Sequence, residues 1–329
     1  MNNIWLSVIV AAYNVEKHIG EALTSILDQI DNSVEIIIVN DGSKDNTLET
    51  VESIYTSHPL GQQLRIINQK NSGVSEARNT GLEIMKGRYV AFLDGDDHVL
   101  PNYYRRLLEA IDRADCAPDI IEFDAIRFSH LKNGDHQNKS LFRINVCGNY
   151  SCVDDQYVVS NIFSHAYWFP WARIYKSKLF EGLRFPPGKS YEDMMLIPQL
   201  YLRANRLAGI NEPLIGYRVN PEGITKNPSH KDLADIESVI DYYLELSASE
   251  NDAFKKKMTM LVACQGALFY KSISNEMKGY LSPIKEISRV VKKVKHQKRD
   301  TDIEIPFNTR MLFVSPALSN LYSYIKKFI

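Results

Sequence analysis

Cysteine is scarce in this sequence. Its 329 residues include only four cysteines, at positions Cys116, Cys147, Cys152 and Cys264. They are too few for a disulfide scaffold of this size, and their spacing matches no short metal-binding motif. The cysteine content therefore fits a protein of the reducing cytosol.

The sequence also lacks an excess of charge of one sign and any long apolar run. Its 39 lysines and arginines nearly balance its 40 aspartates and glutamates, so no nucleic-acid partner is expected. The first apolar run, Leu6 to Ala12, is too short to span a membrane, and no basic residue precedes it as in a secretory signal. We therefore expect no leader peptide and interpret this run as the first strand.

A glycine-rich phosphate loop is missing as well. The residues that follow the first expected strand, Tyr13 to Glu16, contain no glycine. Dinucleotide-dependent dehydrogenases need a glycine fingerprint at this place, and sugar nucleotidyltransferases usually carry a glycine-rich, basic loop there. Both classes of enzyme are therefore disfavoured.

What the sequence does contain is a regular alternation of short apolar runs and helically spaced segments. The expected strands cover 6–12, 34–39, 64–67 and 89–93, and helices are expected over 15–27, 47–55 and 74–85. Such alternation predicts right-handed crossovers and a mostly parallel sheet between helices. The loops after the strands then converge at one edge, where open α/β sheets bind their ligands.

The loop after the fourth expected strand holds three carboxylates within four residues, those of Asp94, Asp96 and Asp97. Burying them without a counter-charge would cost roughly several kcal/mol for each ion. Oxygen ligands favour a hard ion such as Mg²⁺ or Mn²⁺, and such ions also hold phosphates. The alternative is a solvated acidic turn, because Asp-Gly is a common turn dipeptide.

An aromatic segment and an acidic helix start mark the region after residue 101. Trp168 and Trp171 flank a loop that leads to Arg173, and their rings fit either the protein core or a groove against which sugar rings stack. Further along, Glu192 and Asp193 open an expected helix. The helix dipole favours acids there, so capping alone could account for them.

From residue 226 onward the chain is expected to be helical. Between Ile284 and Arg299, seven basic residues accompany a single acid, and the apolar residues recur at helical spacing. The segments Met311–Val314 and Leu318–Ile329 continue this pattern. Basic amphipathic helices of this kind indicate a peripheral position on the inner face of the cell membrane. The alternatives are a helix packed on its own domain with a solvated basic face, or one that pairs with a second copy of the chain in a homo-oligomer.

Five segments taken together resemble the family 2 glycosyltransferases, which have the GT-A fold. The segments are Ser7–Asn14, Ile38–Asp45, Asn71–Asn79, Asp94–Asp97 and Glu192–Asp193, in the family's order. Each is weak alone, but their joint occurrence is specific. The resemblance covers about residues 5 to 225. We expect a GT-A domain over 1–225, with a nucleotide-sugar half over 1–100 and an acceptor half over 101–225, followed by a helical region over 226–329.

The resemblance implies an inverting, metal-dependent hexosyltransferase that moves a sugar from a nucleotide, expected to be UDP, to a hydroxyl of a saccharide acceptor. It implies that the donor is bound by Ala12, Tyr13, Asn14, Asp41, Asn71, Arg78, Asp94 and Gly95. Within this set, Ala12 and Tyr13 would line the base pocket and Asp41 would accept a hydrogen bond from the base. The acceptor would contact Trp168, Trp171 and Arg173.

The resemblance also implies the reacting groups. Asp96 and Asp94 would bind Mn²⁺ or Mg²⁺, and Asn220 stands where family members commonly carry a histidine ligand. Asp193 would be the general base toward the acceptor hydroxyl, with Glu192 as the fallback. Similar enzymes build surface polysaccharides on lipid carriers, so a lipid-linked acceptor is expected. The alternative is a non-catalytic sugar-binding or scaffolding subunit, which would be expected to lose Asp96 or Asp193.

Overall fold

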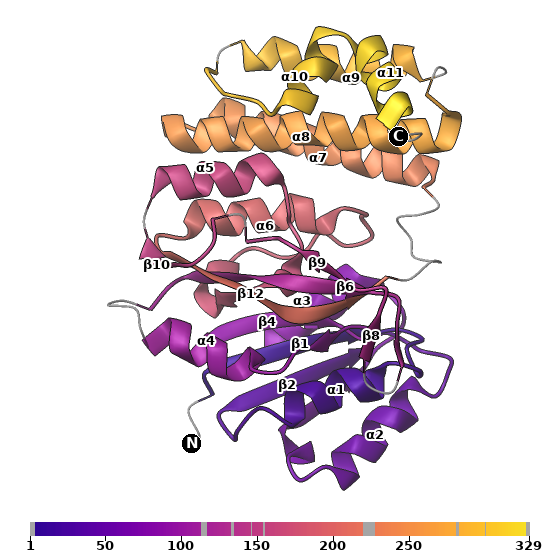
Figure 1. Cartoon of the computed structure of the whole chain (residues 1–329), viewed down its shortest axis with the longest axis vertical. Helices are drawn as coiled ribbons and strands as arrows, with labels where there is room; N and C mark the ends of the chain where they lie inside the picture. Colours follow the sequence, from indigo (N-terminus) through magenta and orange to yellow (C-terminus); the bar gives the residue numbers. More distant parts are fainter. Residues whose placement is uncertain are drawn as a thin grey trace. The chain divides into compact units, whose positions relative to one another are not determined.

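The structure is a computed structural model that describes residues 4–112, 117–132, 135–145, 147–153, 155–219, 228–280, 283–299 and 301–326. The chain divides into two compact units (Figure 1). The first unit comprises Met1–Asp155, Trp168–Gly188 and Gln199–Asn220, and the second comprises Gln156–Tyr167, Lys189–Pro198 and Pro221–Ile329.

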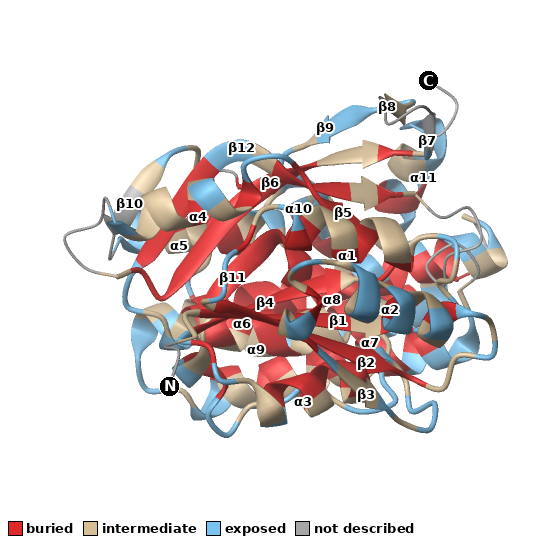
Figure 2. Ribbon diagram, turned by 90° about the horizontal axis from the view of Figure 1, so that it is seen from below, coloured by how far each residue is buried: buried red, intermediate tan, exposed pale blue. Residues whose placement is uncertain are grey.

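The first unit begins with the predicted alternation of strands and helices, which is confirmed. The strands are β1 (Leu6–Ala12), β2 (Val34–Asn40), β3 (Leu64–Asn68) and β4 (Tyr89–Asp94), and the helices are α1 (Ile19–Leu27), α2 (Thr47–Ser57), α3 (Val74–Ile84) and, after β4, α4 (Tyr103–Asp112), with a 3₁₀ turn at Gly61–Gln63. These strands are parallel and lie in the order β3-β2-β1-β4. Because the order reverses at β1, right-handed crossovers place α1 and α2 on one face of the sheet and α3 on the other (Figure 2).

The strands β1, β2 and β4 are buried on both faces, as their apolar runs predict, whereas the edge strand β3 is partly exposed (Figure 2). All seven residues of β2 are buried. The register pairs Ala11 with Asp94 and Ala12 with Asn40, so the carboxyl ends of β1, β2 and β4 coincide. Gly42 follows β2 with a φ of 72°, and a Cβ there would lie 2.8 Å from the backbone nitrogen of Asn71. Only glycine therefore lets the loops after β2 and β3 approach so closely.

The remaining strands extend the sheet beyond β4 in the order β4-β11-β6-β12-β10. They are β5 (His98–Val99), β6 (Ile120–Phe128), β9 (Ser140–Phe142), β10 (Tyr150–Val153), β11 (Arg173–Lys176) and β12 (Leu207–Arg218), with β7 (His130–Lys132) and β8 (Asp135–Gln137) paired separately and 3₁₀ turns at Pro170–Ala172 and Ser177–Phe180. The chain around 207–219 forms one strand with register shifts around Pro213. Proline has no backbone N–H to donate, which interrupts the ladder and accounts for an apolar pattern that resembles two strands.

The second unit is helical. Its helices are α5 (Gln156–His165), the first part of α6 (Glu192–Arg203), α7 (His230–Ser249), α8 (Ala253–Lys278), α9 (Ile284–Lys298), α10 (Phe307–Val314) and α11 (Pro316–Lys326). The start of α7 is fixed by a capping box between Ser229 and Asp232, and the start of α8 by Asp252, which accepts a hydrogen bond from the backbone of Lys255. No described helix is long and apolar enough to cross a membrane.

The apolar side of the basic helix α9 packs against other helices of this unit. Ile287, Val290, Val291 and Val294 are buried, and α9 packs on α7 and α8. On its basic side, Arg289 forms an ion pair with Glu237. The apolar side of α9 is therefore not open to a membrane. Exposed apolar residues occur instead on the last two helices, at Phe307, Val314, Leu318, Leu321, Tyr324 and Ile325.

Candidate functional site

The carboxyl edge of the parallel strands brings the predicted donor-binding segments together. Ala12 ends β1 and is buried, whereas Tyr13 directly after it is 45% exposed. Asp41 and Asp94 stand at the ends of the strands on either side of β1. Since β1 is the strand at which the order reverses, this edge is the topological switch point where such sheets bind ligands.

Asn14 ties two of these loops to each other. It adopts a φ of 52°, its backbone nitrogen donates to Ser43 Oγ at 3.0 Å, and its Oδ1 accepts from the backbone nitrogen of Lys44 at 2.8 Å. The amide therefore fastens the loop after β1 to the loop after β2. Its contact with a donor stays a prediction.

The Asp41 carboxylate is 3% exposed and orders the loop between β3 and α3. It accepts hydrogen bonds from Gln69 Nε2 at 2.8 Å, from the Ser72 nitrogen at 2.9 Å and from the Gly73 nitrogen at 2.8 Å. Asn71 lies exposed in the same loop. Because a carboxylate has about four acceptor positions, Asp41 keeps about one for a ligand.

Arg78 on α3 holds the first acid of the turn after β4. Its side chain is 5% exposed, and Nη2 donates to Asp94 Oδ1 at 2.9 Å. Its guanidinium also lies over the Phe185 ring, 5.3 Å from the centroid. Packing on the aromatic ring and the ion pair together fix the direction in which the Asp94 carboxylate points.

The turn Asp94–Asp97 concentrates negative charge. Its backbone is drawn against β1, because the Gly95 nitrogen donates to the Ala11 oxygen at 3.2 Å and a Cβ at Gly95 would lie 3.0 Å from Val15. Burial and the neighbouring Asp94 raise the pKa of Asp96 to about 6. Burial, with Asp94 and Asp96, also raises the pKa of Asp97.

Arg218, at the end of β12, supports this turn from behind. Its backbone nitrogen donates to Asp97 Oδ1 at 2.7 Å, and its Nε donates to the backbone oxygen of Asp96 at 2.9 Å. Its Nη2 pairs with Glu21 Oε2 at 3.0 Å, and Glu21 Oε1 lies 2.9 Å from His98 Nδ1. Arg218 is not among the site residues predicted from the sequence. The sequence feature that could have indicated its role is a single arginine at the end of an apolar strand.

We expect Arg218→Gln to lower the free energy of unfolding by about 3 kcal/mol, because it leaves buried acidic groups without their counter-charge. Urea unfolding monitored by circular dichroism measures this change. The matched control is Arg105→Gln, whose side chain is 59% exposed and pairs with Glu109, and which should cost about 0–1 kcal/mol. Equal losses in the two variants would contradict the supporting role of Arg218.

The three residues predicted to contact the acceptor are buried in the first unit. Trp168 and Trp171 are each 3% exposed and Arg173 is 1% exposed. Trp171 stacks on Tyr217 with centroids 5.0 Å apart, and Arg173 Nη1 donates to the Phe169 oxygen at 2.8 Å. These side chains therefore pack in the core, which differs from the expectation that they line an open groove. Their contact with an acceptor stays a prediction that their exposure does not support.

The predicted base belongs to the second unit, and the third predicted metal ligand lies outside the described residues. Glu192 and Asp193 open α6 as expected, and they belong to the second unit. Asn220 lies outside the described residues. Their roles toward Asp96 stay predictions.

A divalent cation fits the acid turn, although no group of three or more histidine, cysteine or acidic side chains that could hold a metal occurs within the described part of the chain. Asp97 Oδ2 is buried and has no hydrogen-bond partner there. Together with the raised pKa of Asp96, this indicates negative charge that Arg78 and Arg218 compensate only in part. Mg²⁺ and Mn²⁺ often use only one or two carboxylates, because substrate phosphates complete their coordination.

Comparison with known proteins gives consistent matches. The family model described as Glycosyl transferase family 2 matches residues 7–169. Glycosyltransferase GlyA of Streptococcus pneumoniae is 32% identical over 229 residues, which are 67% of this chain and 31% of GlyA, so the match spans about a third of that protein. The uncharacterized glycosyltransferase EpsJ of Bacillus subtilis is 28% identical over 268 residues, which are 79% of this chain and 72% of EpsJ.

Solved structures share the fold. TarS 1-349 of S. aureus, in complex with UDP-GlcNAc, has a TM-score of 0.72 at 19% identity and covers 98% of this chain and 92% of its own. The mannosyltransferase PcManGT of Pyrobaculum calidifontis, in complex with GDP-Man and Mn²⁺, has a TM-score of 0.57 at 14% identity, with coverage of 98% and 86%. The mostly parallel sheet between helices is thus of the GT-A type, followed by helices α7–α11. Together with the matched segment and the relatives in sequence, this shows that the chain belongs to glycosyltransferase family 2.

Proposed function

We propose that the protein is an inverting hexosyltransferase that transfers a sugar from a UDP-sugar to a hydroxyl of a saccharide acceptor during synthesis of a bacterial surface polysaccharide. The observation that carries this proposal is the acid turn at the switch point of the sheet, with Asp41 across β1 from Asp94. The relatives support the biological setting, since the minor teichoic acid biosynthesis protein GgaB of Bacillus subtilis is 28% identical over 224 residues. TarS, with UDP-GlcNAc bound, supports the donor class.

The donor half of the reaction depends on residues of the first unit. Ala12 and Tyr13 would line the base, and Asp41 would use its remaining acceptor position for a base N–H. Asp94, held by Arg78, would face the ribose or support the metal. The Asp41 and Asp94 side chains are fixed by contacts within the protein, so this part of the site would already be ordered when the donor binds.

Asp96 and Asp94 would hold Mn²⁺ or Mg²⁺. When bound, such an ion stabilises the negative charge of the departing nucleoside diphosphate. The crowded carboxylates supply the matching charge, and Arg218 fixes the backbone on which Asp96 is carried.

The acceptor half of the reaction needs a base and a displacement from the face opposite the leaving group. Asp193 would take the proton of the acceptor hydroxyl as that oxygen attacks the anomeric carbon. Attack from that side inverts the configuration at the anomeric carbon. Glu192 is the neighbouring carboxylate on the same helical turn.

A lipid-linked acceptor would bring the enzyme to the inner face of the cell membrane. Since the apolar side of α9 is buried, the attachment would use the exposed apolar residues of α10 and α11. An exposed apolar helix face with basic neighbours is typical of proteins that lie on a membrane surface.

Calorimetric titration of the full chain with UDP, GDP, dTDP and CMP, each with and without Mn²⁺, tests the donor proposal. We expect UDP to bind at least about 10-fold more tightly with Mn²⁺ than with EDTA, because Asp96 and Asp94 would hold the ion and its charge would attract the diphosphate. The other nucleotides should bind more weakly than UDP. Failure of every nucleotide to bind under both conditions would contradict the transferase and favour the non-catalytic subunit.

A further inference from the structure

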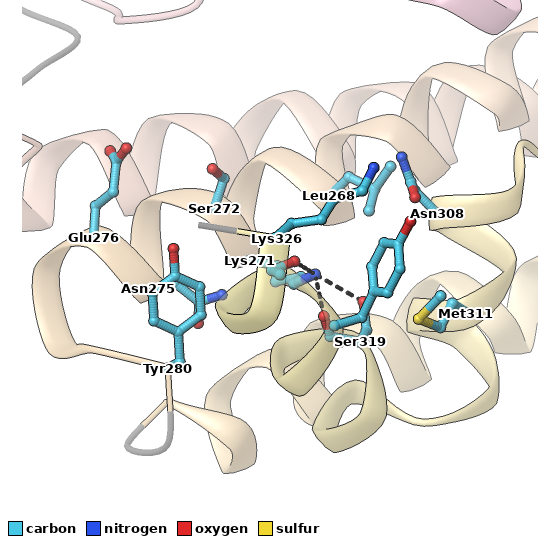
Figure 3. A pocket seen from close by; sticks show the side chains of 12 residues that line it. Leu268, Lys271, Ser272, Asn275, Glu276, Tyr280, Asn308, Met311, Ser319 and Lys326 are labelled. Carbon is cyan, nitrogen blue, oxygen red and sulfur yellow. Dashed lines mark hydrogen bonds between the residues drawn. The ribbon is translucent and has the colours of Figure 1, made fainter. Parts of the chain in front are cut away.

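A cavity of about 270 Å³ lies in the second unit, lined by α8, α10 and α11 (Figure 3). Lys271 of α8 reaches into it and is only 6% exposed. Its Nζ donates to the backbone oxygen of Ser319 at 2.9 Å, to Ser319 Oγ at 2.7 Å and to Ser323 Oγ at 2.8 Å (Figure 3). The family resemblance gives this group of residues no role.

The Lys271 ammonium is buried among neutral acceptors. Burial lowers its pKa to about 8, and no carboxylate pairs with it among the described residues. Lys326 adds a second positive charge to the lining, and Glu276 is the acid there. Figure 3 shows Glu276 at the left of the view and Ser319 near its middle. Because a buried charge without a counter-ion is costly, an anion in this cavity would stabilise it.

The hydroxyl groups around Lys271 supply hydrogen-bond donors for such an anion. Ser319 and Ser323 accept from the ammonium through their oxygens, so their own protons remain to be donated. The three N–H groups of the ammonium are already donated to Ser319 and Ser323, so Lys271 would act on an anion through its charge. Hydroxyl donors beside a buried positive charge suit the oxygens of a phosphate group.

An acceptor for a ligand hydroxyl lines the same cavity. Asn275 Nδ2 donates to Asn320 Oδ1 at 3.1 Å, and Asn320 Nδ2 in turn donates to the Tyr280 oxygen at 2.8 Å. These two bonds set the direction of the Asn275 amide, whose Oδ1 is buried without a partner among the described residues. The cavity thus offers both a phosphate-binding part and an acceptor for a hydroxyl.

The helix that supplies the serines also presents an apolar stripe to solvent. Leu318, Leu321 and Ile325 are between 46% and 58% exposed, and their spacing of three and four residues aligns them along one side of α11. Ser319, Ser323 and Lys326 follow their own helical spacing on the adjacent side of α11. A helix lying on a membrane places its apolar side among acyl chains and its neighbouring basic groups at the level of the headgroups.

We propose that this cavity binds the phosphate of an anionic glycerophospholipid with a hydroxyl-bearing headgroup, while the apolar stripe of α11 lies on the same bilayer. The inference rests on the membrane attachment proposed above and adds a specific lipid site to it. A lipid is favoured over free phosphate because the exposed apolar stripe and the cavity share one helix.

Vesicle co-sedimentation of the full chain tests this site. Wild-type protein should bind vesicles of phosphatidylcholine with about 30% phosphatidylglycerol about 10-fold more tightly than vesicles of phosphatidylcholine alone. Lys271→Met should remove most of this preference. Ser323→Ala, which keeps the net charge, should reduce it about 3-fold, the loss expected for a hydrogen bond. The matched control Lys255→Gln lies exposed near the start of α8 and should change binding less than 2-fold.

Three outcomes would overturn the proposal: equal binding of the wild type to both kinds of vesicle, wild-type binding by both Lys271→Met and Ser323→Ala, or occupancy of the site by inorganic phosphate with no vesicle binding at all. Circular dichroism checks that each variant is folded. Titration of Lys271→Met with UDP and Mn²⁺ should match the wild type. Failure of the lipid site can therefore be distinguished from failure of the transferase proposal.

Discussion

Asp96→Asn is expected to lower the rate of sugar transfer about 10³-fold or more, because it removes a carboxylate charge from the ion that would stabilise the leaving diphosphate. The amide has nearly the shape of the carboxylate, so the turn should keep its backbone contacts with Arg218. Transfer from a UDP-sugar at saturating Mn²⁺, together with calorimetric titration of UDP, measures the loss in kcat and in metal-dependent binding.

The same substitution should make the metal-free protein more stable. Burial and repulsion by Asp94 raise the pKa of Asp96, so its ionised form destabilises the fold at neutral pH. If Asp96→Asn is inactive but unfolds at a higher temperature than the wild type, the Asp96 carboxylate serves the reaction and not the stability of the fold. The control is Asp28→Asn, whose side chain is 63% exposed. Retention of transfer within 10-fold of wild type in Asp96→Asn would contradict the proposed role.

Asp193→Asn is expected to lower kcat by about 10²–10⁴-fold, the usual contribution of a general base. Binding of UDP with Mn²⁺ should stay at the wild-type level, because the proposed donor contacts come from the first unit. Single-turnover transfer measures the chemical step, and calorimetry measures donor binding.

Glu192→Gln is the matched control for this test, because the two acids are neighbours in the first turn of α6. It should cost less than about 10-fold if Asp193 is the base. A larger loss in Glu192→Gln than in Asp193→Asn would assign the base to Glu192. A loss of donor binding in Asp193→Asn equal to its loss in kcat would contradict a role confined to the acceptor.

The sequence was sufficient to predict the strands of the donor half to within about two residues at each end. The strands β1, β2 and β4 consist mostly of apolar, often β-branched residues, which is the pattern of a strand buried on both faces. The run Val34–Val39 became β2 with one residue added. Once the strands are parallel, their ends must share an edge, so the convergence of Asp41 and Asp94 followed from topology alone.

Long-range contacts could not be predicted in this way. Arg218 reaches the backbone of Asp96 across 122 positions in the chain, and no periodicity records such a pairing. The sequence around a tryptophan is the same whether its ring stacks on a sugar or, as Trp171 does in this structure, on Tyr217. The strand β11 was not predicted, because aromatic and apolar residues are frequent throughout the segment that precedes it.

The C-terminal region shows a related limit. An amphipathic pattern indicates that a helix has an apolar side, but it does not indicate whether protein or lipid covers that side. In α9 the cover is protein, whereas the exposed residues of α11 form a shorter and less basic pattern. The sequence therefore predicts amphipathic helices in both segments, but it does not tell which of them keeps its apolar side open.

The burial of Ile287, Val290 and Val294 has a practical consequence for work with shortened proteins. A protein that ends before α9 would lack the helix that covers α7 and α8. The apolar side chains of α7 and α8 would then be exposed to solvent, which promotes aggregation and unspecific binding to vesicles. A trimmed protein would thus stick to lipid for reasons unrelated to the native one. Single substitutions at exposed positions such as Leu321 report on attachment without that artefact.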